Sequence, residues 1–379
     1  MGEYHDLYLH TDILLLVDVF ENFRKLCLEN YGLDPAHYVS SPGLSWDANL
    51  KMSGINLELL TDVDMFQFIE RGIRGGISVI THRHAKANNP YMKLYNPNNE
   101  TTYIIYLDAN NLYGFAMSQP LPYRNFKWVK PNADNTPFEK KEGIGYIYEV
   151  DLEYPKELHN LHNEYPCAPE KMLITDDMLS KYCKEIKEKN KISSGNVQKL
   201  IQNLNDKKNY VLHERNLELY LSLGLKLTKV HSALQFEEKP WLKDYIDFNT
   251  KMRKNAKNDF EKDFYKLMNN SIYGKTMENI RKRSNTFLET DPDHFKKLAS
   301  QPTFKSCKIF HENLAAVQTT KKKLTLDKPI YAGMCILDIS KTLTLREMSN
   351  FVEFTGPWYS STLGESWIGT RRVREREVS

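Results

Sequence analysis

The sequence predicts a mixed α/β fold of the α+β type, with helical and strand-rich stretches following one another along the chain. Three stretches carry this prediction. Residues 9–28 repeat apolar side chains at helical spacing, and residues 102–107 (TYIIYL) are β-branched and aromatic, as in a buried strand. Residues 240–273 have the pattern of one long helix or of two close ones. At 379 residues, the chain has room for two or three domains.

The composition excludes several classes of protein. Hydrophobic residues make up 41% and charged residues 27%, which is typical of soluble globular chains and not of disordered or collagenous ones. The five cysteines show no metal-binding spacing and fit a reducing compartment. No apolar run approaches the ~18–20 residues of a membrane span, and no signal peptide is evident at the start. We therefore expect a soluble intracellular protein without a membrane partner.

The other expected elements follow from local pattern. They are helices at 56–71 and 179–210, a short β-rich run after Gly75 and Gly76, and strands at 308–318 and 329–339. Residues 346–379 show no clear helix or strand period, so we expect poor order there.

A carboxylate directly follows the strand predicted at 102–107. Asp108 lies in the segment YLDANNLYG (106–114), and a strand fixes the backbone of such a residue while its side chain reaches the rim of the sheet, where metals bind. Tyr113 follows where the chain should turn. Taken alone, the segment also fits a strand-capping Asp followed by a packed Tyr.

A second segment, KLMNNSIYGK (266–275), lies in a basic stretch. Residues 251–285 hold ten Lys or Arg and four Asp or Glu, a local excess of +6 against +3 for the whole chain. The spacing of Lys254, Lys262 and Lys266 places them toward one face of a helix, with Asn258 in the intervening turn. Such a row of ammonium groups suits a triphosphate, while a solvated charged helix is the alternative.

Together, the two segments resemble family B DNA polymerases, most closely the protein-primed branch found in linear plasmids, certain DNA viruses and self-synthesising transposons. The resemblance covers about residues 1–345. It implies a right-hand polymerase fold with an antiparallel palm sheet and helical fingers. It also implies DNA-directed DNA polymerase activity, in which a dNTP is transferred to a primer 3′-OH with two Mg²⁺ or Mn²⁺ ions. Primer–template DNA, dNTP and a terminal priming protein are the implied partners.

The resemblance also assigns roles to residues. Asp108 matches the catalytic metal ligand of motif A, and Tyr113 matches the tyrosine that excludes a ribose 2′-OH. The other residues expected at the incoming nucleotide are Asn111, Leu112, Lys254, Lys262, the catalytic Lys266, Asn270, Tyr273 and Gly274. Two further matches lie nearer the start of the chain. Arg74, Gly75 and Gly76 resemble the DNA-binding segment between exonuclease and polymerase parts, and Tyr8 and Asp12 resemble the third exonuclease motif.

Some of the family pattern is missing. No Asp-Thr-Asp of motif C occurs. Asp338 ends an apolar run and is a candidate surrogate ligand, although the same position fits a buried structural Asp. The first two exonuclease motifs are absent, and Asp12 alone cannot hold two metals, so no proofreading is expected. The acidic groups at 175–177 and 291–294 are interpreted as loops or helix caps.

We therefore expect the middle part of a larger polymerase, incomplete at both ends. The expected parts are an exonuclease remnant (1–35), a connection and palm with motif A (36–125), an insertion (126–238), fingers with motif B (239–285), further palm (286–345) and an unmatched tail (346–379). Three functions stay open: a polymerase, a DNA- and nucleotide-binding remnant that performs no chemistry, and an α/β protein with a basic helix and no catalysis.

Overall fold

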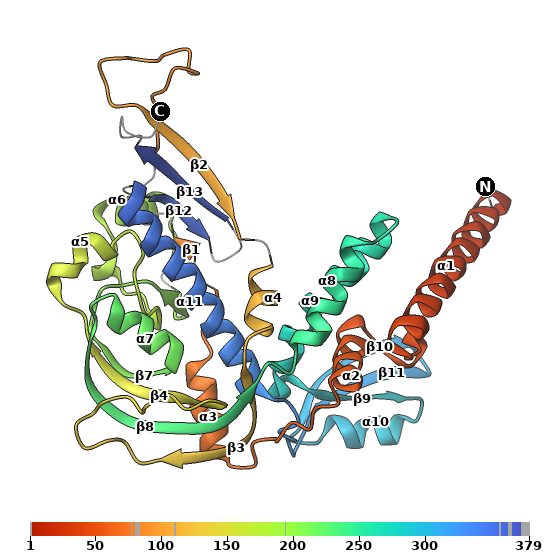
Figure 1. The fold of residues 1–379 in the computed structure, drawn as a ribbon. Coiled ribbons are helices and arrows are strands. Elements are labelled where there is room, and N and C mark those ends of the chain that lie inside the picture. Colours follow the sequence, from red (N-terminus) through yellow and green to blue (C-terminus); the bar gives the residue numbers. More distant parts are fainter. Residues whose placement is uncertain are drawn as a thin grey trace.

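The computed structural model describes residues 2–76, 78–79, 84–109, 111–193, 195–355, 358–362 and 366–372 (Figure 1). The helices are α1 (Gly2–Tyr31), α2 (Ser41–Ser53), α3 (Val63–Gly72), α4 (Leu112–Met117), α5 (His159–His162), α6 (Lys181–Lys189), α7 (Glu214–Ser222), α8 (Lys243–Lys254), α9 (Asp259–Thr276), α10 (Pro292–Ala299) and α11 (Ile330–Thr355). No helix within these ranges is long and apolar enough to cross a bilayer.

The strands form four antiparallel sheets. The largest described core is built on the sheet of order β3-β8-β4-β7, from β3 (Leu121–Val129), β4 (Ile144–Glu153), β7 (Lys207–His213) and β8 (Lys226–Lys239). A second sheet has the order β1-β12-β13-β2, from β1 (Ser78–Val79), β2 (Thr102–Asp108), β12 (Trp358–Thr362) and β13 (Ser366–Arg372). The smaller sheets are β10-β11-β9, from β9 (Ser284–Glu289), β10 (Phe304–His311) and β11 (Leu314–Thr320), and the hairpin of β5 (Glu170–Leu173) and β6 (Gln198–Ile201).

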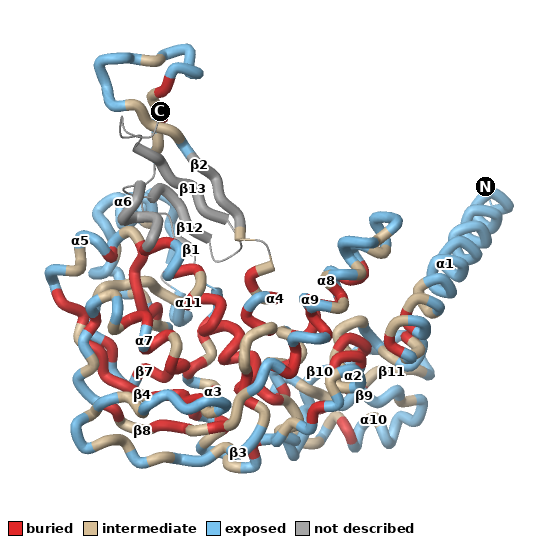
Figure 2. The backbone as a smooth tube through the Cα atoms, in the orientation of Figure 1, coloured by how far each residue is buried: buried red, intermediate tan, exposed pale blue. Residues whose placement is uncertain are grey.

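Strand alternation divides the β3-β8-β4-β7 sheet between two cores. On one face, Ile147 and Phe236 pack with residues of α2, α3, α9 and α11. On the other face, Tyr148 and Leu212 pack with residues of α7 and with Leu345. Helix α11 therefore contributes to both cores, and Figure 2 shows its buried first half between the sheet and α4.

Several predicted elements are confirmed. The amphipathic run 9–28 lies within α1, the β-branched run 102–107 forms most of β2, and residues 240–273 form the two helices α8 and α9. In Figure 1 these two helices form a hairpin that extends away from the β3-β8-β4-β7 sheet. Local pattern sufficed here because apolar residues recur at helical spacing in the helices and β-branched and aromatic residues dominate the strand.

Four predictions of secondary structure are wrong, at least in part. Residues 329–339 are helical rather than extended, because Ile330–Ile339 form the start of α11 and are almost all buried, so no polar face reveals the helix. The helix expected at 179–210 is limited to α6 and is followed by β6 and β7. The helix expected at 56–71 begins only at Val63, where the Asp62 side chain accepts a hydrogen bond from the Asp64 N–H. The strand expected at 308–318 is divided into β10 and β11.

The unmatched end of the chain also contains regular elements. Helix α11 continues to Thr355, and β12 and β13 pair with each other. Strand β13 also pairs with β2 over its whole length, from Ser366 opposite Asp108 to Arg372 opposite Thr102. The sequence of 346–379 shows no clear strand period of its own, because the pairing partner of β13 lies far away in the sequence, and poor order in this stretch stays a prediction.

Gly333 lets α11 approach the end of α9 closely. A Cβ atom at this position would overlap the Met277 side chain and crowd Thr276. We therefore expect Gly333→Val to lower the free energy of unfolding by about 1–3 kcal/mol through overpacking, measured by urea denaturation. The control is Gly195→Ala, where nothing lies within 4 Å of the added atom. Equal stability of the two variants would show that Met277 moves aside at little cost.

Candidate nucleic-acid interface

The basic stretch folds into the hairpin of α8 and α9. Helix α8 ends at Lys254, and the Asn258 side chain begins α9 by accepting a hydrogen bond from the Glu261 N–H at 2.9 Å. Asn258 therefore starts a new helix rather than filling a turn of one continuous helix, which corrects the predicted single helical face. Lys254 and Lys262 belong to different helices of the hairpin and are both exposed.

Helix α9 has one exposed and one buried face. The side chains of Phe264, Tyr265, Met268 and Ile272 are buried in the core. The predicted nucleotide-binding positions recur every four residues on the exposed side, at Lys262, Lys266, Asn270 and Gly274. The ammonium groups and the amide therefore share one broad solvent-facing surface.

The two predicted motifs meet through their tyrosines. Tyr113 of α4 and Tyr273 of α9 have ring centroids 4.9 Å apart, with the ring planes tilted by 30°. Burial raises the pKa of Tyr273 well above its usual value, so its hydroxyl stays protonated at neutral pH. This contact joins segments that are far apart in the sequence, as the resemblance implies.

Asn111 and Leu112 shape the turn before Tyr113. Asn111 has a left-handed backbone with φ of 59°, and its side chain lies over Gly114 so closely that any Cβ at Gly114 would overlap it. Leu112 is 2% exposed and packs in the interior, and its contact with a nucleotide stays a prediction. Asn111 is only partly exposed.

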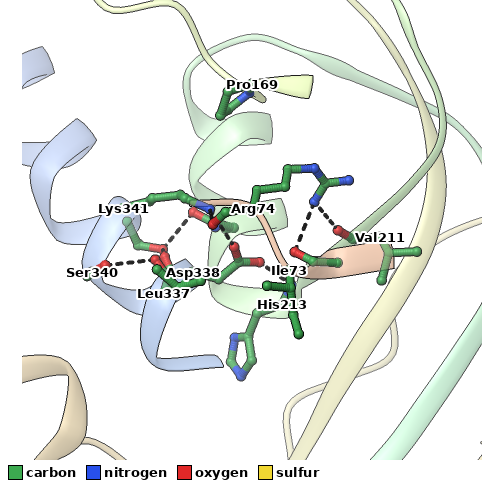
Figure 3. A network of polar contacts seen from close by, with 12 residues as sticks. Ile73, Arg74, Pro169, Val211, His213, Leu337, Asp338, Ser340 and Lys341 are labelled. Atoms are coloured by element: carbon green, nitrogen blue, oxygen red, sulfur yellow. Dashed lines mark hydrogen bonds and ion pairs between the residues drawn. The ribbon is translucent and has the colours of Figure 1, made fainter. Parts of the chain in front are cut away.

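Asp108 is the last residue of β2, the position predicted for a metal ligand. Its side chain lies outside the described residues, so its role as a ligand stays a prediction. Asp338, the candidate surrogate, is 2% exposed and lies within α11. Its carboxylate accepts a hydrogen bond from the His213 N–H at 3.0 Å and pairs with Lys341 at 3.4 Å (Figure 3). The interpretation as a buried structural Asp is confirmed.

The described residues contain one group of side chains that could hold a metal ion. The one group of three His, Cys, Asp or Glu side chains found close together in the described ranges is His213, Glu214 and Glu238, with ligand atoms within 4.8 Å. Sequence reasoning missed this group, although His213 and Glu214 lie at the junction of a strand and a helix, where polar side chains often gather.

The segment that resembles the DNA-binding glycines is described up to Gly76. Arg74 is 7% exposed, and its guanidinium donates to the Val211 carbonyl at 2.6 Å (Figure 3). The guanidinium also lies 3.6 Å from the centre of the Tyr210 ring. The side chain of Arg74 is therefore held in the interior, and a contact of this residue with DNA stays a prediction. Gly75 and Gly76 are exposed, and DNA contact through their backbone stays a prediction.

The remaining predicted positions lie apart from this interface or have a structural role. Tyr8 and Asp12 are exposed on α1, one helical turn apart, and neither belongs to the group of three ligand side chains. Asp291 caps α10 by accepting a hydrogen bond from the Asp293 N–H at 2.9 Å, which confirms the interpretation of 291–294 as a helix cap.

Comparison with known proteins agrees with the predicted fold. The family described as DNA polymerase type B, organellar and viral, matches residues 5–354. No curated protein matches the chain. Phi29 DNA polymerase complexed with primer-template DNA and incoming nucleotide superposes with a TM-score of 0.52 at 15% identity, covering 90% of this chain and 50% of that one. Phi29 DNA polymerase complexed with single-stranded DNA gives 0.51 at 16% identity, covering 94% and 51%.

This likeness confirms the fold class predicted from the sequence, a polymerase architecture of helices and antiparallel sheet. The chain spans about half the length of the solved polymerases that it matches. The family match extends over most of its residues. The chain therefore belongs to the type B DNA polymerases of the organellar and viral family.

Proposed function

We propose that this chain serves DNA-directed DNA polymerisation, the template-directed transfer of a nucleotide from a dNTP to a primer 3′-OH. The observation that carries the proposal is the ring contact between Tyr113 and Tyr273, next to the exposed face of α9. It joins the two motif segments into one surface with an aromatic platform and a row of ammonium groups. A nucleoside triphosphate needs both kinds of partner, because its base is flat and aromatic and its phosphates are highly charged.

The proposed roles follow from position on this surface. Lys262 and Lys266 neutralise the triphosphate, and Lys254 approaches it from the neighbouring helix. Gly274 has no side chain, and nothing lies within 4 Å of the place that a Cβ would take, so a base pair can approach the backbone there. Tyr113 presents its ring to the sugar and restricts space for a 2′-OH. Primer–template DNA is held mainly through phosphates, with strong salt dependence.

Metal ions enter this proposal only through Asp108. Mg²⁺ or Mn²⁺ would supply positive charge at the attacking and leaving oxygens. The described residues do not fit a complete pair of ions, because the carboxylate of Asp338 is already bonded to Lys341 and to the His213 N–H. This pairing favours a second candidate function, in which the chain binds DNA and nucleotide without chemistry.

Primer extension with Mg²⁺ or Mn²⁺ separates the two candidates. Extension that is lost in Asp108→Asn supports polymerisation by this chain. Primer–template binding at low salt without any extension supports the binding function. Failure to bind primer–template at low salt contradicts both, because both need the basic surface of α8 and α9.

Loss of one ammonium group on α9 should weaken nucleotide binding. We expect Lys266→Ala to reduce dNTP affinity by about tenfold or more, because one charge-assisted contact to phosphate is lost. Affinity is measured by fluorescence titration of dNTP into the chain with bound primer–template. The control is Lys297→Ala, which removes an equally exposed lysine from α10. If both variants bind dNTP as the unaltered chain does, α9 is not the triphosphate site.

A further inference from the structure

Two lysines from distant parts of the chain hold the backbone just before Gly75. Lys341 of α11 donates a hydrogen bond from Nζ to the Arg74 carbonyl at 3.1 Å. Lys171 of β5 donates from Nζ to the Ile73 carbonyl at 3.0 Å. Two consecutive carbonyl groups of one short segment are therefore each bonded to an ammonium group.

The ammonium group of Lys341 is held in the interior. The Lys341 side chain is 2% exposed, and its charge is balanced by Asp338, whose carboxylate lies 3.4 Å away and is 3% exposed (Figure 3). Burial lowers the pKa of Lys341, and the neighbouring Asp338 opposes this effect. A buried ion pair contributes little net stability compared with apolar packing. Its contribution here is geometric, since Lys341 fixes one particular carbonyl of the connecting segment.

The side chain of Arg74 also fixes this segment, by contacts with β7. Its guanidinium bonds the Val211 carbonyl of β7 and covers the Tyr210 ring. The next two residues, Gly75 and Gly76, are exposed, and nothing lies within 4 Å of the place that a Cβ would take at Gly75. A firmly anchored residue therefore directly precedes a pair of glycines with an open, accessible backbone.

We infer that Lys171 and Lys341 are positioning residues for DNA binding: they fix the carbonyls of Ile73 and Arg74 and thereby orient the exposed backbone of Gly75 and Gly76 toward a nucleic-acid phosphate. The inference rests on the proposed function, because it takes DNA as the ligand. Backbone N–H groups are common donors to phosphate and need an ordered chain to act as such. Lys171 also links the insertion, through the β5–β6 hairpin, to this segment.

Trypsin cleavage after Arg74 tests the anchoring without any DNA. Arg74 is buried, so the bond to Gly75 is cut only when the segment opens, and the rate reports the open population. In the full chain we expect Lys171→Met to raise the rate of cleavage at this bond by about fivefold, the effect of losing one hydrogen bond of a charged donor. Lys171→Arg should restore it. Cleavage of Lys171→Met at the unaltered rate would overturn the inference.

Lys199→Met is the matched control. Lys199 is an exposed lysine of β6, opposite Met172, and so lies on the other face of the same hairpin. Its substitution removes the same charge and should leave cleavage after Arg74 unchanged. Asp338→Asn and Lys341→Met, if they fold, should also raise the cleavage rate, because both disturb the bond to the Arg74 carbonyl. If they do not fold, Lys171→Met decides the question alone.

Primer–template binding, followed by fluorescence anisotropy at fixed salt, tests the link to DNA. We expect Lys171→Met to bind several-fold more weakly than Lys199→Met, since only the former releases the segment. Equal binding of the two variants, with faster cleavage after Arg74 in Lys171→Met, would overturn the link to DNA. If the unaltered chain binds no primer–template, the proposed function fails, while the cleavage result still decides the anchoring.

Discussion

Asp338→Ala is expected to lower the free energy of unfolding by about 3–5 kcal/mol, because it leaves the Lys341 ammonium group buried without its counter-charge. It also removes the acceptor of the buried His213 N–H, which is bonded to Asp338 at 3.0 Å. Urea denaturation measures the loss as a lower midpoint at an unchanged slope.

The chain contains a matched control for this prediction. Asp293 and Lys296 form an ion pair with the same spacing of three residues on a helix, at 3.5 Å, but their side chains are 91% and 76% exposed. We expect Asp293→Ala to cost less than about 1 kcal/mol, since surface pairs contribute little. The double variant Asp338→Ala with Lys341→Met should recover part of the loss, because it removes the stranded charge. A loss below about 1 kcal/mol for Asp338→Ala would mean that Lys341 finds another partner or water.

Local pattern predicted the elements that have a distinct face or composition. Helices α8 and α9 fall largely within the helical stretch predicted at 240–273, and β2 was predicted because its residues are β-branched and aromatic. The start of α11 was taken for a strand because nearly every side chain from Ile330 to Ile339 is buried. The pairing of β13 with β2 depends on a partner far away in the sequence, which no local pattern contains.

In the candidate site, the positions of residues on a helix could be predicted from their spacing. The roles of residues that are buried in the folded chain could not. The spacing of Lys262 and Lys266 correctly indicated one face of α9, whereas Lys254 lies on the neighbouring helix α8. Arg74 has the charge of a DNA contact, yet its guanidinium is turned toward Tyr210. Lys341 was not predicted at all, because a lysine in a sequence is normally expected at the surface, and its burial depends on Asp338 and on the carbonyl of Arg74.

In the group of His213, Glu214 and Glu238, burial lowers the pKa of the histidine and raises the pKa of Glu214. His213 is fully buried, which lowers its pKa to about 3, so the ring is neutral. Its Nδ1 accepts a hydrogen bond from the Arg215 N–H at 3.2 Å, so the neutral ring carries its proton on Nε2, which is a donor rather than a free metal ligand. Burial and the nearby Glu238 and Glu218 raise the pKa of Glu214 to about 8, while Lys140 and Arg215 oppose this effect more weakly.

His213 and Glu214 affect the free energy of unfolding in different pH ranges. The folded-state pKa of Glu214 is raised from 4.5 to about 8, so its contribution to stability is present below pH 4.5 and is lost as the pH rises through 8. The folded-state pKa of His213 is lowered from 6.5 to about 3, so its contribution is present above pH 6.5 and is lost as the pH falls toward 3. Between pH 6.5 and 9, a loss of stability with rising pH therefore reports Glu214 and its carboxylate neighbour.

Glu214→Gln is therefore expected to flatten the stability profile at alkaline pH. The amide fills the same space without ionising, so the variant should be more stable than the unaltered chain at pH 9 by an amount on the order of several kcal/mol, at about 1.4 kcal/mol for each unit of pKa shift. Below pH 4.5 the difference should nearly vanish, because Glu214 is then mostly protonated in both the folded and the unfolded state. Urea denaturation at several pH values measures both quantities.

Glu218→Gln is the control. Glu218 lies on the same helix, but its side chain is 47% exposed and paired to Lys140 at 2.7 Å, so the substitution should leave the profile almost unchanged. A profile of Glu214→Gln parallel to that of the unaltered chain would show that Glu214 reaches water and ionises normally.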